Sequence, residues 1–154
     1  MISRLLPQPI DNVYRGTKPG VWLLAVVVFV KLLQSVSVIF GGYSILQSAD
    51  GVPVETFPAP AAQSVVALFA ISALSRLILS LLCILVLIRY RSAVPLMFAV
   101  LSLDYLGREL MFFLYPLVRT GAPPGPYVNF ALFALTMIGL ALSLLPQRKS
   151  RAPH

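Results

Sequence analysis

Ionised side chains interrupt three long apolar segments of this chain. Charges at membrane depth are costly, so they turn towards the protein interior and often mark a ligand or proton pathway. Carboxylates in such a place could relay protons, and cations could attract an anion. We therefore take one group as a candidate ligand-binding, ion-binding or proton-relay site: Lys31, Gln34, Arg76, Asp104, Tyr105, Arg108 and Glu109.

The spacing of these residues predicts how they could meet. Asp104 and Arg108 are four positions apart, so they share one helix face and could pair within that helix. Glu109 is rotated by about 100° from Arg108 and would point towards a different neighbour. Lys31 and Arg76 fall near the middle of their own segments and could approach the carboxylates from adjacent helices.

The charges of this group do not balance, because three cations face two carboxylates. Loss of a proton from Lys31 would restore neutrality. A bound anion would do the same. A structural interpretation stands beside these two, in which the group is a polar clasp that fixes how three helices pack. The sequence leaves the three interpretations open.

Composition places the chain in a membrane. It is 58% hydrophobic and 11% charged, whereas soluble domains carry about 25% charged residues. The net charge of +7 is compatible with nucleic-acid binding. The cations lie in short flanks between apolar runs and form no basic face, so we expect no nucleic-acid partner.

Residue types that commonly hold cofactors are scarce. The one cysteine is Cys83 and the one histidine is His154. We therefore expect no cofactor, no metal site and no catalytic residues. A membrane enzyme acting on a lipid, with Glu109 or Asp104 as general base, is the least favoured alternative because no nucleophile is visible.

The apolar segments predict an all-α integral membrane fold, a bundle of four transmembrane helices. Each segment is long enough to cross the hydrocarbon core, which takes about 20 helical residues. We expect an arm at 1–20, membrane spans at about 21–46, 64–88, 93–118 and 127–145, outer loops at 48–62 and 119–126, an inner turn at 89–92 and a tail at 146–154. The small pairs Ser37/Gly41 and Gly139/Ser143 have the spacing of close helix contacts.

The distribution of cations predicts the orientation. If the N-terminus is cytoplasmic, eight cations lie on the cytoplasmic side and only Arg119 lies on the other. Cytoplasmic loops carry an excess of Lys and Arg, so both termini are expected to be cytoplasmic, in a bacterial inner membrane. The eight are Arg4, Arg15, Lys18, Arg89, Arg91, Arg148, Lys149 and Arg151.

Two functions from different classes remain. The favoured one is a small non-enzymatic membrane protein that acts as a structural, assembly or accessory component. The alternative is a small proton-coupled or anion-coupled transporter or channel that uses the charged group. The expected partners are the lipid bilayer, a second copy of the chain or another membrane protein, and a small anion.

Overall fold

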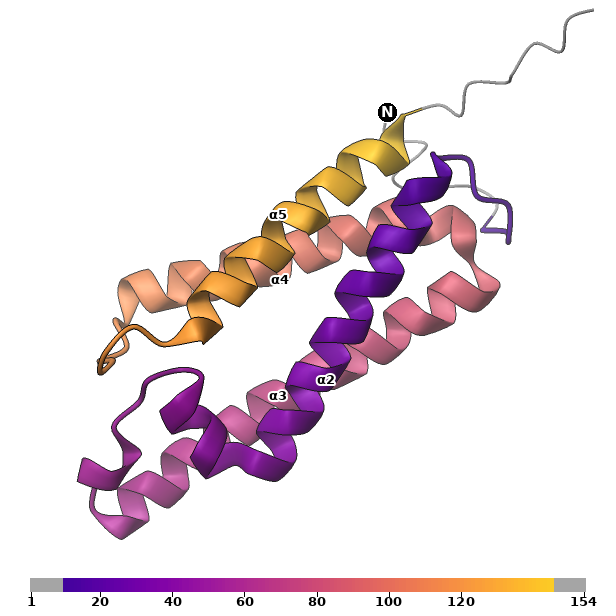
Figure 1. Ribbon diagram of the computed structural model, residues 1–154. Coiled ribbons are helices and arrows are strands. Elements are labelled where there is room, and N and C mark those ends of the chain that lie inside the picture. The colour runs from indigo at the N-terminus through magenta and orange to yellow at the C-terminus, as the bar shows by residue number, and fades with distance from the viewer. Residues whose placement is uncertain (1–9, 146–154) are drawn as a thin grey trace, which may run out of the picture.

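The computed structural model describes residues 10–145 and is all-α, as expected. Residues 1–9 of the expected arm and the tail at 146–154 lie outside the described residues. Two single-turn 3-10 helices join the long helices, η1 (Val54–Thr56) and η2 (Arg91–Ala93). The four long helices in Figure 1 are α2 (Lys18–Ser48), α3 (Ala59–Arg89), α4 (Val94–Leu114) and α5 (Pro124–Leu144).

Three of the four helices, α2, α3 and α5, are long and apolar enough to cross a membrane. Helix α4 has 21 residues, which at about 1.5 Å per residue also approaches the thickness of a bilayer core. It is set apart from the others by its three ionised residues, Asp104, Arg108 and Glu109.

Prolines explain why three helix ends differ from the expected span ends. Helix α3 begins at Ala59, ahead of Pro60, and α5 begins at Pro124. The first turn needs no backbone N–H donors, so a proline there is tolerated. Helix α4 ends at Leu114. Tyr115 precedes Pro116, which disfavours the helical conformation of the residue before it.

The bundle pairs α2 with α3 and α4 with α5, and α5 also packs on α2 (Figure 1). Helices α3 and α4 follow one another in the chain but contact each other much less than the paired helices do. The core is formed mainly by one stripe of α2 and one of α4, with Gly139 of α5 lying so close to Phe98 that a side chain there would overlap the ring. Its fully buried members include Leu24, Val27, Val28, Phe98 and Leu101.

Polar backbone contacts close both ends of the bundle. At one end the segment before α2 crosses to the α3–α4 turn, where Asp11 and Ser92 exchange hydrogen bonds of 2.8 to 3.2 Å. At the other end, which we call the loop end, the Thr120 N–H donates to the Gly51 carbonyl at 2.8 Å and the Gly125 N–H donates to the Ala49 carbonyl at 2.9 Å. The connections α2–α3 and α4–α5 are thereby tied together.

Gly51 is needed at this junction. Its φ of +71° lies in the left-handed region, which glycine adopts without steric cost. A Cβ atom there would also lie 2.8 Å from the Pro123 ring and 3.0 Å from the Thr120 carbonyl oxygen. Helix α2 bends at a second glycine, Gly41, whose φ of −109° and ψ of 19° are not helical.

Candidate functional site

Lys31 and Asp104 form an ion pair between the middles of α2 and α4. The Lys31 Nζ lies 3.9 Å from the Asp104 Oδ2, and the two side chains are 9% and 31% exposed. Lys31 belongs to the buried stripe of α2, which recurs every three or four residues. The apolar face therefore carries the ammonium group to the neighbouring carboxylate. This pair confirms the prediction that Lys31 approaches an α4 carboxylate from another helix, as one buried salt bridge.

The predicted pair between Asp104 and Arg108 does not form. Among residues 10–145 the ion pairs are Lys31–Asp104 and Arg15–Asp11. The Arg108 guanidinium lies instead over the Tyr105 ring, 5.6 Å from its centroid. The Phe133 ring also stacks on Tyr105, with ring centroids 4.3 Å apart. The Arg108 Nε and Nη2 atoms are inaccessible to solvent and have no hydrogen-bond partner.

Among the described residues, Arg76 donates hydrogen bonds only to Ser72 of its own helix. Its Nε donates to the Ser72 carbonyl at 3.3 Å and its Nη2 donates to the Ser72 hydroxyl at 3.1 Å. No carboxylate in the described part of the chain comes within ion-pair distance of it. Glu109 is exposed, and so the five charges do not form the single buried cluster that the sequence suggests.

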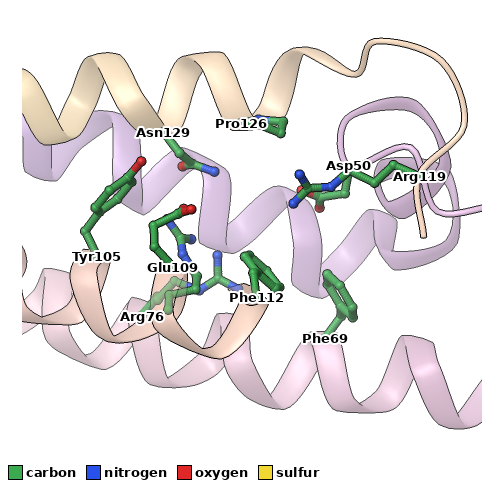
Figure 2. A pocket seen from close by; sticks show the side chains of 10 residues that line it. Asp50, Phe69, Arg76, Tyr105, Glu109, Phe112, Arg119, Pro126 and Asn129 are labelled. Carbon is green, nitrogen blue, oxygen red and sulfur yellow. The ribbon is translucent and has the colours of Figure 1, made fainter. Parts of the chain in front are cut away.

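A small cavity of about 150 Å³ collects three arginines near the loop end. We call it the three-arginine cavity. In Figure 2, Tyr105, Glu109 and Arg76 stand at one end of it, and Asp50 and Arg119 stand at the other. Three guanidiniums and two carboxylates give it a charge of +1 when all are ionised. Its lining residues are Asp50, Phe69, Arg76, Tyr105, Arg108, Glu109, Phe112, Arg119, Pro126 and Asn129.

Three polar residues of this lining were not among the sequence candidates: Asp50, Arg119 and Asn129. The tied connections at the loop end bring Asp50 and Arg119 over the cavity. The Arg119 guanidinium lies 5.3 Å from the centroid of the Phe112 ring. Burial raises the pKa of the Asp50 carboxyl above its ordinary value, and the charges of Arg76 and Arg119 oppose that rise.

The remaining candidates lie beside this cavity rather than in it. Gln34 lines a groove of about 310 Å³ between α2 and α5, which it shares with Asp50, Arg76 and Asn129. Asp104 lines a larger groove of about 870 Å³ between α3 and α4. Lys31 lines none of these three spaces and contacts the site through Asp104. Arg76 borders all three, so it is the central cation of the arrangement.

The chemistry of the three-arginine cavity favours an anionic ligand. Guanidinium groups present planar donors that match carboxylates and phosphates, and they remain charged when partly buried. Within residues 10–145 no group of three His, Cys, Asp or Glu side chains could hold a metal ion. Comparisons with protein-family models, curated proteins and solved structures give no match for this chain.

Proposed function

We propose that the protein is an integral membrane protein of four spanning helices, with both termini cytoplasmic, that binds a small anionic group in the three-arginine cavity. It acts as a non-enzymatic accessory component whose ligand is held and not converted. The observation that carries the proposal is the unpartnered guanidinium of Arg108, whose Nε and Nη2 are buried without an acceptor.

The cost of burying Arg108 and the size of the cavity both favour a bound anion. A buried donor without a partner costs about 1–3 kcal/mol or more when it is charged, so such groups persist where a ligand supplies the acceptor. The cavity volume of about 150 Å³ is well above the minimum that holds one water molecule and leaves room for one phosphate-sized group. The surplus positive charge of the cavity also favours a bound anion.

The α4 span is part of the proposal because two of its three ionised residues face other parts of the protein. Asp104 faces Lys31, and Arg108 faces the Tyr105 ring and the cavity. Burying these groups removes much of the cost of about 2.5–3.5 kcal/mol for each ionised residue at the centre of a lipid-facing helix. Four crossings return the end of α5 to the side on which α2 begins.

The test is a titration of the purified protein with inorganic phosphate while its thermal unfolding is followed. A ligand that binds only the folded state raises stability by about 2.7 kcal/mol at a hundred times its Kd. Arg119→Gln and Arg76→Gln should each weaken binding about tenfold, a change of about 1.4 kcal/mol. Asp50→Asn should strengthen it, because a carboxylate beside the anion is removed.

A matched control is Arg91→Gln, which removes an exposed arginine at the opposite end of the bundle from the cavity. Its phosphate affinity should equal that of the wild type. If the wild type and all variants shift alike, or if no shift occurs, phosphate does not occupy this cavity. Turnover of a substrate by the purified protein would contradict the non-enzymatic part of the proposal.

A second candidate function, anion or proton transport, is favoured by the Lys31–Asp104 pair. This pair lies at the middle of two helices, and Asp104 also lines the groove that reaches Arg76 and Arg108. A series of charged groups from mid-bundle to the loop end is the arrangement that a relay requires. Flux of protons or phosphate in liposomes, abolished by Asp104→Asn, would support it, and flux indifferent to this substitution would remove it.

A further inference from the structure

The α3–α4 groove opens alongside the three-arginine cavity and shares its walls. Its volume is about 870 Å³. The four residues Phe69, Arg76, Arg108 and Phe112 line both spaces. The two spaces therefore meet at two guanidiniums, one side being small and polar and the other large and mainly apolar.

Beside the arginines and the polar residues Ser72, Ser75 and Asp104, the groove has aliphatic walls. They are formed by Leu68 and Leu79 of α3 and by Leu103 and Met111 of α4. Leu68 and Leu103 are 66% and 70% exposed, so they form open rims of the groove. In a helix that crosses a bilayer, such rims contact lipid directly.

The length of the groove fits one leaflet. From Leu68 to Leu79 helix α3 advances about 16 Å at 1.5 Å per residue, about half of the 30 Å hydrocarbon core. Leu68 lies towards the loop end of α3, as do the residues that close the cavity. Arg76 lies between these two leucines, so a chain in the groove would pass the guanidiniums between the loop end and the middle of the bilayer.

Some of the guanidinium donors at the junction lack acceptors in the described part of the protein. Arg108 has two buried guanidinium nitrogens without a partner. Arg76 bonds only Ser72 on its own helix and leaves its other N–H groups for a ligand. Charge complementarity at the junction therefore selects an anionic group, and the apolar groove beside it selects a hydrocarbon chain.

We propose that the anion bound by the three-arginine cavity is the phosphate of an anionic lipid, which enters sideways between α3 and α4 and lays one acyl chain in the groove. This inference rests on the proposed anion binding and names the source of the anion. Arg76, Arg108 and Arg119 hold the phosphate. The aliphatic walls hold the chain.

The experiment compares three probes that separate headgroup from chain. The delipidated protein in detergent is titrated with phosphatidic acid, with phosphatidylcholine and with inorganic phosphate, and binding is followed by native mass spectrometry and thermal unfolding. Phosphatidic acid should bind at least about tenfold more tightly than either of the others. Phosphatidylcholine carries the chains without a net charge, and inorganic phosphate carries the charge without a chain.

One glycine allows the groove to be filled without disturbing the core. A Cβ at Gly107 would meet no atom within 4 Å, and Gly107 lines the groove but not the cavity. Gly107→Leu should weaken phosphatidic acid about tenfold and leave inorganic phosphate unchanged. Leu106→Phe, a bulkier side chain at an exposed neighbour outside the groove, is the matched control and should change neither.

The outcomes distinguish this inference from the proposed function. If inorganic phosphate binds as tightly as phosphatidic acid and Gly107→Leu has no effect, the ligand is a soluble anion and the lipid inference is overturned while anion binding stands. If phosphatidylcholine binds as well as phosphatidic acid, the groove binds acyl chains without selecting the charge of the headgroup, and the anionic-lipid inference fails. If none of the probes binds and the protein remains folded, both proposals fail.

Discussion

The ammonium of Lys31 and the carboxylate of Asp104 lie 3.9 Å apart at the middle of two different helices. This distance is too long for a hydrogen bond, which for N–H donors ends near 3.2 Å, so the pair is held by charge alone. Lys31 is 8% exposed as a residue and depends on Asp104 for its compensating charge. The contact joins α2 to α4, the two helices whose apolar side chains form most of the core.

Breaking this pair should destabilise the bundle. Asp104→Asn leaves the Lys31 ammonium buried without a counter-charge. Fully buried pairs lose about 3–5 kcal/mol when one partner is removed, and the 31% exposure of the Asp104 side chain reduces our expectation to about 1–3 kcal/mol. The measurement is the melting temperature in detergent.

A double substitution separates the pair from its surroundings. Lys31→Met with Asp104→Asn removes both charges and should recover most of the lost stability, because no ion remains unpaired. Arg76→Gln should cost little by comparison, since Arg76 bonds only Ser72 on its own helix. A single Asp104→Asn variant as stable as the wild type would mean that the pair is not a structural clasp.

The long helices could be predicted from the sequence because apolar runs of membrane length leave few alternatives. Their ends were harder to place. Prolines at 58, 60, 123, 124 and 126 are typical of loops. In the structure Pro60 lies in the first turn of α3, and Pro124 and Pro126 lie in the first turn of α5. A proline suits a loop and a first helical turn equally, so composition alone does not separate the two.

The Lys31–Asp104 pair could also be predicted, because both residues fall at the same depth of their segments. The three-arginine cavity could not be predicted from the sequence. Asp50 and Arg119 reach it only because Gly51 and Thr120 bond across two connections, and a tertiary contact between loops leaves no periodic signal. Arg108 shows the converse: its spacing from Asp104 allows a pair, but Lys31 lies closest to that carboxylate.

Gly139 should tolerate no side chain. A Cβ at this position of α5 would overlap the ring of Phe98, which is fully buried in the core. Overpacking of this kind costs about 1–3 kcal/mol, so Gly139→Ala should lower the melting temperature. Gly139→Ala combined with Phe98→Leu should restore part of the loss.

Gly107→Ala is the matched substitution in a helix with open space around the glycine. Alanine loses less conformational entropy than glycine on entering a helix, and the gain is about 0.5–1 kcal/mol. Its melting temperature should therefore rise slightly. If Gly139→Ala and Gly107→Ala shift the melting temperature in the same direction, Gly139 and Phe98 are not in the close contact described here.

Asp50 should make stability depend on pH in the acid range. Burial raises its pKa, so the folded protein holds this proton more strongly than the unfolded chain does. Stability is then highest below the ordinary carboxyl pKa of about 4 and falls as the pH rises through the raised value. Asp50→Asn should remove this component from thermal unfolding measured at a series of pH values. A steeper slope in the variant would contradict the assignment.

Tyr14 should produce a second pH dependence, at the alkaline end. Its hydroxyl is buried without a partner, against Gly16 and Gly20, and burial raises its pKa from 10 to about 12. Between these values the unfolded tyrosine ionises while the folded one keeps its proton, so the wild type loses up to about 1.4 kcal/mol per pH unit that Tyr14→Phe does not lose. At neutral pH Tyr14→Phe should be as stable as the wild type or more so, because it removes an unsatisfied hydroxyl. Parallel stability curves above pH 10 would show that solvent reaches this hydroxyl.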